Sequence, residues 1–249
     1  MAGRIRFEPS RRAVLAAGAA LLAVRPARAE GALSVFAAAS LKPALDEIAM
    51  QWSGSLSLSY GGSGSLARQV ALGAPVDVVI LAATDWMDWL EGQGVLDGER
   101  VTVARNRLVL AGPSGAAPLD LTAEAIDARL GPEGRMAMGD PLSVPAGRYG
   151  QQALETLGLW SDLAPRTLFA EDVRAALAYV ARGDVALGLV YGSDLLGSNV
   201  AEVAALPAAT HQAILYPGAV VAGARPGAEA FLAHVATQAD VFARHGFRP

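Results

Sequence analysis

Small and hydroxyl-bearing residues recur in this chain where a strand-like apolar run gives way to a helix-like amphipathic one. A helix N-terminus at such a junction presents unpaired backbone N–H groups and the positive end of the helix dipole. Several converging junctions can therefore bind an anion without any lysine or arginine, and hydroxyls add further donors. The junctions are VFAAASL with Ser40, YGGSGS with Ser63 and Ser65, GDPLSVPAG with Ala146, AEDV with Val173, and VYGSD with Tyr191.

Ordinary helix capping is the competing interpretation of each junction. Ser40, Ser65 and Ser193 are of a residue type that favours the N-cap position, and Asp172 is placed to cap the stretch VRAALAYVARG. Taken singly, each of these side chains is better explained as a cap. Only the set of junctions predicts a binding site.

Sequence motifs that would indicate an enzyme are less convincing than the set of junctions. The stretch GSGSLA, residues 62–67, satisfies the dinucleotide pattern G-x-G-x-x-A, with Asp85 further along the chain. The preceding LSLSY alternates with serines, which is unfavourable for a buried central strand, so a nucleotide-dependent enzyme is kept only as an alternative. The nucleophile pattern G-x-S-x-G fails at residues 61–65, and the histidines and acids lack metal-ligand spacing. The chain is predicted not to be an enzyme and to have no cofactor, no catalytic residue and no direct metal ligand.

The composition suits a compact soluble protein of one large domain or two smaller ones and argues against a nucleic-acid partner. The chain has 249 residues, 53% of them hydrophobic, and a formal net charge of -4. The first 29 residues hold six arginines and one acid, which leaves 14 basic and 23 acidic residues, or -9, in the remainder. Nucleic-acid binding needs clustered Lys and Arg, and this chain has a single lysine.

The N-terminus has the pattern of an export signal, predicted for residues 1–29 with cleavage near Ala29. Paired arginines precede an apolar run that is too short to span a membrane. The SRR start resembles a twin-arginine signal, although Val14 stands where that motif prefers a bulkier residue, so ordinary secretion stays open. Because the chain has no cysteine, disulfides and a lipidated anchor are excluded, and the mature protein is predicted to be free in the periplasm.

The elements that must position these junctions form two groups. Short apolar runs alternate with amphipathic ones, which is typical of βα units around a mostly parallel sheet. VDVVILA is apolar without a break, as a strand covered on both faces should be. The Gly and Pro cluster in RLVLAGPSG ends the first group. Two α/β groups predict two lobes with a cleft between them, and ligands of such sheets bind beyond the carboxyl ends of the strands.

Five motifs resemble, in the same order, the periplasmic molybdate-binding proteins of ABC transporters. They are VFAAASL, SLARQVALGAPVDVVILA, GDPLSVPAG, AEDVRAALAYVARGD and GLVYGSD, and the similarity runs over residues 33–247. The resemblance implies an α/β, two-lobed type II periplasmic binding protein fold, each lobe a mostly parallel sheet flanked by helices. It implies crossings between the lobes near 107–113 and 215–222, with lobe 1 formed by 30–108 and 219–249 and lobe 2 by 109–218.

The same resemblance implies a set of ligands for the oxyanion. They are the hydroxyl and backbone N–H of Ser40, the hydroxyl of Ser63, the backbone N–H groups of Ala146 and Val173, and the phenol of Tyr191. The family often has a run of serines before L-A-R-Q where this chain has GGSGS, so Ser65 is an alternative to Ser63. A tetrahedral dianion offers only acceptor oxygens, which suits a pocket of donors, and none of the five residues supplies a carboxylate.

The implied function is high-affinity binding of molybdate, and of tungstate, by a monomer that delivers the ion to a membrane permease. Two alternatives remain open: a binding protein for another oxyanion such as sulfate or for a small organic acid, and a nucleotide-dependent enzyme. Of the neighbouring side chains, Trp86 and Trp89 are expected to pack against the surface of a lobe, and Arg148 to be solvated.

Overall fold

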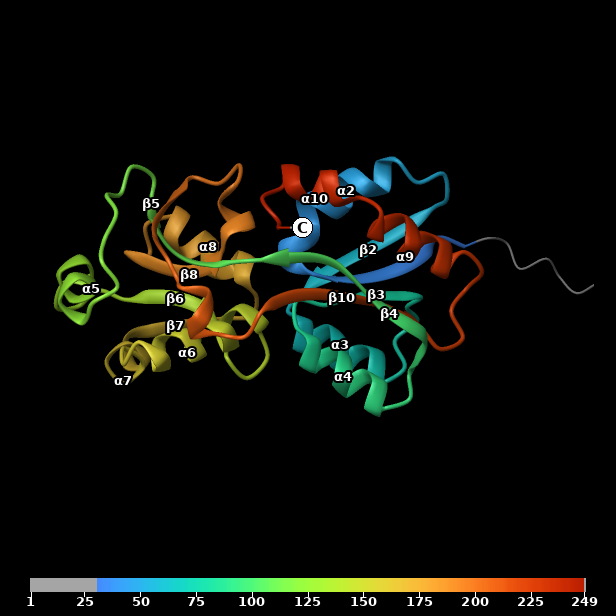
Figure 1. The fold of residues 1–249 in the computed structure, drawn as a ribbon, viewed down its shortest axis with the longest axis horizontal. Coiled ribbons are helices and arrows are strands. Elements are labelled where there is room, and N and C mark those ends of the chain that lie inside the picture. The colour runs from blue at the N-terminus through green and yellow to red at the C-terminus, as the bar shows by residue number, and fades with distance from the viewer. Residues whose placement is uncertain (1–30, 249) are drawn as a thin grey trace, which may run out of the picture. The chain divides into compact units, whose positions relative to one another are not determined.

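Two five-stranded sheets organise the computed structural model, which describes residues 31–248 (Figure 1). The first sheet has the order β2-β1-β3-β10-β4 and the second the order β7-β6-β8-β5-β9. Strands of the first sheet are β1 (Leu33–Ala38), β2 (Leu56–Gly61), β3 (Val78–Ile80), β4 (Leu96–Asn106) and β10 (Ile214–Val221). Those of the second are β5 (Leu108–Pro113), β6 (Met136–Gly139), β7 (Thr167–Ala170), β8 (Leu187–Tyr191) and β9 (Val200–Ala205).

Helices pack on both faces of each sheet (Figure 1). With the first sheet lie the short 3-10 turn η2 (Ala39–Leu41) and α2 (Lys42–Met50), α3 (Ser63–Ala71), α4 (Thr84–Gly92), α9 (Ala228–Ala236) and α10 (Ala239–Arg244). With the second lie α5 (Ala123–Leu130), α6 (Pro145–Thr156), α7 (Trp160–Leu163), α8 (Val173–Ala181) and the 3-10 turns η3 (Ala164–Arg166), η4 (Gly192–Leu195) and η5 (Ala208–Thr210).

The unbroken apolar run around β3 lies in the middle of the first sheet and is covered on both faces, as the run predicted. Val78 and Ile80 join the core under α2 and α9, whereas Val79 and Leu81 join the cluster under α3 and α4. All four side chains are fully buried. Burial of one such side chain contributes roughly 1.5–3 kcal/mol, so this strand anchors both layers of helices.

Each sheet is mixed. β1 pairs in parallel with β2 and β3, and β6 pairs in parallel with β7 and β8. β10 and β5 run antiparallel to both of their neighbours. The parallel part of each sheet comes from the predicted βα units, and the antiparallel strands belong to the segments that lead from one sheet to the other.

The connections between the sheets are short. Only Arg107 separates β4 of the first sheet from β5 of the second. The return connection, from β9 to β10, ends before Ile214, which already pairs with Asn106 in the first sheet. The sequence placed the end of lobe 2 slightly later, at residue 218. The division into lobes stays a prediction, and the export signal at residues 1–29 lies outside the described residues. Within residues 31–248 there is no helix with the length and apolar character needed to cross a membrane.

Asp77, just before β3, ties together three segments of the first sheet. Its carboxylate accepts hydrogen bonds from the backbone N–H of Ser34 at 2.7 Å and from the backbone N–H of Arg225 at 2.8 Å, and it pairs with the Arg225 guanidinium at 2.8 Å. Burial by itself raises the pKa of Asp77, but the hydrogen bonds from Arg225 and Ser34 outweigh burial and lower it. The charged form is therefore the one that stabilises the fold.

We expect Asp77→Asn to lower the free energy of unfolding at pH 7 by about 1–3 kcal/mol, because charged hydrogen bonds are lost. A lowered pKa contributes stability above the unfolded value, near 4, and this contribution is lost as pH falls through the folded value. The deficit of the variant should therefore shrink between pH 7 and pH 3. Urea unfolding at both pH values measures it, and an equal deficit at both would contradict this account.

Candidate functional site

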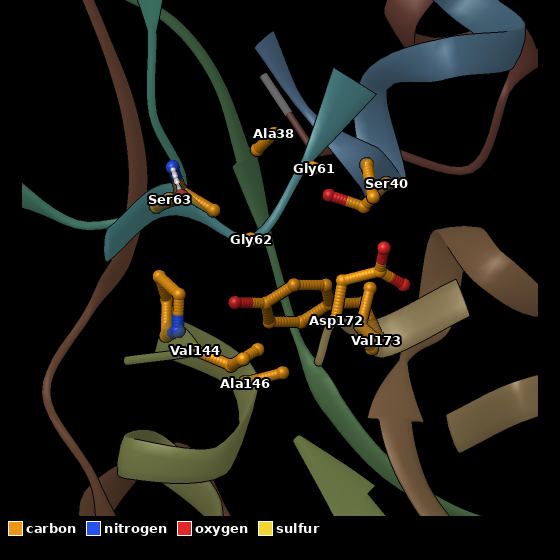
Figure 2. A pocket seen from close by; sticks show the side chains of 13 residues that line it. Ala38, Ser40, Gly61, Gly62, Ser63, Val144, Ala146, Asp172 and Val173 are labelled. Carbon is orange, nitrogen blue, oxygen red and sulfur yellow. Dashed lines mark hydrogen bonds between the residues drawn. The ribbon is translucent and has the colours of Figure 1, made fainter. Parts of the chain in front are cut away.

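All five residues predicted to bind the anion line one pocket (Figure 2). Figure 2 shows Ser40 and Ser63 on one side of this pocket and Ala146 and Val173 on the other. The cavity is small, about 10 Å³, which is roughly the room that a single buried water molecule needs. A dinucleotide is far too large for the pocket in this form.

The first sheet contributes the two serines. Ser40 lies in η2, directly after β1, and Ser63 is the first residue of α3, after β2 and Gly62. β1 and β2 are parallel neighbours whose last residues, Ala38 and Gly61, are paired, so both serines stand at the same carboxyl-end edge of the sheet. Both are buried. Strand topology therefore brings them together although 22 positions separate them in the sequence.

The second sheet contributes two helix N-termini and a phenol. Ala146 lies in the first turn of α6, Val173 opens α8, and Tyr191 ends β8. The backbone N–H groups of a first helical turn have no acceptor within their own helix. β7 and β8 both run parallel to β6, so the three residues again share one edge of a sheet.

The three hydroxyls differ in their hydrogen bonds. Ser63 Oγ accepts from the backbone N–H of Ala82 at 3.0 Å, and Ser40 Oγ is 2.9 Å from the hydroxyl of Tyr216. The Tyr191 hydroxyl is buried and has no hydrogen-bond partner among the described residues. A buried polar group without a partner costs about 1–3 kcal/mol, so this phenol indicates that a ligand completes the site.

Burial raises the pKa of Tyr191 well above its ordinary value, and Tyr216, Tyr149 and Asp194 act in the same direction. The phenol is therefore protonated at neutral pH and is able to donate. Its backbone is held by Asp194, whose Oδ2 accepts from the Tyr191 N–H at 3.1 Å. Burial raises the pKa of Asp194 to about 7, against the lowering effect of Arg174.

Ser65, the alternative to Ser63, lies away from the pocket lining. It is exposed on α3, where its Oγ accepts a long hydrogen bond of 3.4 Å from Gln69. The structure thus brings Ser63 and not Ser65 to the pocket. Asp85, the acid of the alternative dinucleotide site, forms an ion pair with Arg148.

The sequence did not predict that a charged side chain, that of Asp172, lies at the pocket. Asp172 lines the pocket as well as capping α8, where its Oδ1 accepts from the Ala175 N–H at 2.8 Å. The capping role was predicted from the sequence and is confirmed. The five predicted ligands supply no carboxylate, but the pocket itself contains one at its edge (Figure 2). The signal was available in the motif AEDV, because an N-cap side chain lies beside the N–H groups of its own helix.

Contacts also link α3 and α4 to the start of α6 and the segment before it. The Gly64 N–H donates to the Ser143 carbonyl at 3.0 Å, and Arg148 pairs with Asp85. The Arg148 guanidinium also lies 5.5 Å from the centre of the Trp86 ring. Arg148 was expected to be solvated, and 31% of its side chain is indeed exposed, but its guanidinium also pairs with a carboxylate and faces an aromatic ring.

No group of three or more His, Asp or Glu within residues 31–248 has the arrangement of a metal site. Backbone N–H groups such as those of Ala146 and Val173 can only donate, which suits an anion.

Comparison with known proteins identifies the family. A model of bacterial extracellular solute-binding proteins matches residues 33–248. Molybdate-binding protein ModA of Escherichia coli (strain K12) is 40% identical over 232 residues, which cover 88% of this chain and 89% of that protein.

Solved structures agree. The substrate binding domain of a putative molybdenum ABC transporter from Clostridium difficile is 30% identical with a TM-score of 0.64 and covers 87% of this chain and 97% of its own. The periplasmic molybdate-binding protein of Azotobacter vinelandii has a TM-score of 0.75 at 24% identity, with 87% and 99% covered, a likeness of fold. The predicted two-lobed binding-protein fold is confirmed. The chain therefore belongs to the bacterial extracellular solute-binding proteins and, as its five motifs predicted, to the molybdate-binding family within them.

Proposed function

We propose that this protein binds molybdate, and also tungstate, and delivers the ion to the permease of an ABC importer. The ligands are the hydroxyls of Ser40, Ser63 and Tyr191 and the backbone N–H groups of Ala146 and Val173. The observation that carries this proposal is the buried Tyr191 hydroxyl, which lacks a partner within residues 31–248 and belongs to a residue that lines the same cavity as Ser40 and Ser63.

Donors alone are sufficient to hold a dianion here. A hydrogen bond to a charged group contributes about 1.5–3 kcal/mol, and two helix N-termini add the favourable ends of their dipoles. Five such donors offset the desolvation of a small ion. A protonated anion such as hydrogen phosphate also needs an acceptor, and none of the five ligands is a carboxylate.

The ion is expected to bridge the two sheets, since its ligands come from both. Contacts made only when the two halves are together stabilise that arrangement over an open one. Recognition of the closed form by the permease then couples binding to transport. In this proposal the protein acts as a monomer in the periplasm, without catalysis.

A panel of ligands tests the proposal. Molybdate and tungstate should each raise the melting temperature strongly, sulfate and phosphate weakly, and NAD not at all, since a ligand that binds only the native state stabilises it. Titration calorimetry then gives the affinity and stoichiometry. A larger rise in melting temperature with sulfate than with molybdate would identify sulfate as the ligand instead. A rise with NAD alone would favour a nucleotide-dependent enzyme.

Asp172 favours a second candidate, an anion that carries a proton, because its carboxylate is an acceptor at the pocket edge. Asp172→Asn separates the two candidates. Asparagine keeps the N-cap of α8 and removes a negative charge, so we expect molybdate to bind about three- to tenfold more tightly. If the natural ligand were a protonated anion, the same change would weaken its binding. Calorimetry with molybdate and with phosphate at pH 8 measures both effects.

A further inference from the structure

A chain of buried hydrogen bonds runs behind the pocket from Ser40. The Ser40 Oγ lies 2.9 Å from the Tyr216 hydroxyl on β10. The side-chain amide of Asn106, the last residue of β4, donates to that same hydroxyl at 3.1 Å and to Ser193 Oγ at 2.8 Å. All four residues are buried, and Tyr216 is fully buried. Asn106 and Tyr216 lie on strands of the first sheet and Ser40 directly follows one, whereas Ser193 follows β8 of the second sheet.

The Asn106 amide has only one acceptable orientation. Its Oδ1 accepts from the backbone N–H of Arg107 at 2.9 Å. A flipped amide would set an NH2 group against that N–H and an oxygen against the two hydroxyls, so the backbone fixes the assignment. The Nδ2 group is therefore the one that faces Tyr216 and Ser193, and it can only donate.

This orientation sets the direction of the whole chain. The Tyr216 oxygen accepts from Asn106, and its single proton is then directed at Ser40 Oγ. Burial raises the pKa of the Tyr216 phenol, and nearby Asp194 adds to the effect, so the proton is present at neutral pH. Ser40 Oγ accordingly accepts from behind, and its own proton is left for the pocket.

Ser63 shows the same arrangement by a different route. Its Oγ accepts from the backbone N–H of Ala82, so its proton is likewise left for the pocket. Both serine hydroxyls of the first sheet are supplied with a donor from outside the pocket. The arrangement is thus a shared property of the two serines, although only the one at Ser40 depends on side chains that substitution can change.

We propose that Asn106 and Tyr216 are positioning residues that hold Ser40 as a donor and so deny a protonated oxyanion an acceptor at this position. The inference rests on the proposed function and assigns selectivity to two residues outside the pocket lining. Asp172 is the carboxylate in the pocket lining. Its own contribution to selectivity is measured separately with the Asp172→Asn variant described above.

Asn106→Asp should reverse the chain. A carboxylate accepts the Tyr216 proton, Tyr216 then accepts from Ser40, and Ser40 turns its lone pairs toward the pocket. We expect molybdate affinity to fall about 10- to 100-fold, because one charged hydrogen bond is replaced by a repulsive contact. The ratio of molybdate to hydrogen phosphate affinity at pH 8 should fall in parallel.

A double-mutant cycle with Tyr216→Phe distinguishes this mechanism from simple charge repulsion by the new aspartate. Without the phenol there is no relay, so Asn106→Asp should cost less than about threefold in the Tyr216→Phe background. The same loss in both backgrounds would overturn the inference. Thermal unfolding of each variant checks that it is folded.

If Asn106→Asp does not fold, Tyr216→Phe alone carries the test. Tyr216→Phe should lower the ratio of molybdate affinity to hydrogen phosphate affinity, whereas Tyr60→Phe should leave this ratio unchanged. Tyr60 is the matched control, because its hydroxyl donates to Asp46 at 2.7 Å at a site away from the pocket lining. An unchanged ratio in Tyr216→Phe would overturn the relay but leave the proposed function standing. A wild-type protein that binds neither molybdate nor tungstate would overturn both.

Discussion

Replacement of both Ser40 and Ser63 by alanine is expected to weaken molybdate binding by about 10²- to 10⁴-fold. Each hydroxyl supplies a hydrogen bond to a charged group, worth about 1.5–3 kcal/mol, and each 1.4 kcal/mol is a factor of ten in affinity. The Ser63 change also leaves the Ala82 N–H without its acceptor, which is a cost to the unliganded protein as well. Calorimetric titration of the single and double variants measures the loss.

Ser65→Ala is the control for this experiment. Ser65 stands two residues from Ser63 on the same helix but is exposed and is not part of the pocket lining. We expect its affinity for molybdate to equal that of the wild type. A loss at Ser65 as large as that at Ser63 would show that the aligned hydroxyl had been wrongly identified.

Gly64→Ala is expected to weaken molybdate binding more than it lowers the stability of the ligand-free protein. A Cβ at Gly64 would lie 2.6 Å from the Ser143 carbonyl oxygen and 2.5 Å from the Trp86 ring, so α3 and the segment before α6 would be forced apart. Overpacking of this kind costs about 1–3 kcal/mol, which predicts a loss of molybdate affinity of about 10- to 100-fold. Alanine also favours a helix over glycine by about 1 kcal/mol, which offsets part of the clash with Trp86, so the ligand-free protein should lose less stability than the complex.

Gly92→Ala provides the comparison for Gly64→Ala. Gly92 ends α4, and a Cβ there would meet no atom within 4 Å. This variant should bind molybdate normally. If Gly64→Ala also binds normally, the contact between α3 and Ser143 is not needed for the bound form. If instead Gly64→Ala loses as much stability as affinity, the added Cβ destabilises the fold itself and not the bound form in particular.

The pattern of short apolar and amphipathic runs was enough to predict the two α/β groups. The interior of β3 shows why: an unbroken apolar run tolerates water on neither face, so helices must cover both. The antiparallel strands were not predicted. β10 pairs with β4 across more than a hundred residues, and a strand's own sequence says little about the direction of its neighbour.

The capping role of Asp172 was predicted for a similar reason, because an N-cap contacts only its own helix. Its place at the pocket was not predicted, since that depends on what lies opposite α8. Arg148 was expected in solvent, because its partner Asp85 lies in the other half of the chain and no local pattern couples them.

The sequence by itself determined where the donors stand: at the ends of strands and the starts of helices, in an order typical of a molybdate-binding family. Local preferences suffice for that, because capping, periodicity and turn chemistry act over a few residues. The tertiary structure alone decided that five junctions meet at one cavity, that Ser63 rather than Ser65 reaches it, and that Tyr216 lies behind Ser40. Ser40 and Tyr216 are 176 residues apart, and the direction of a proton between them depends on a third residue, Asn106, which only the folded chain brings within reach.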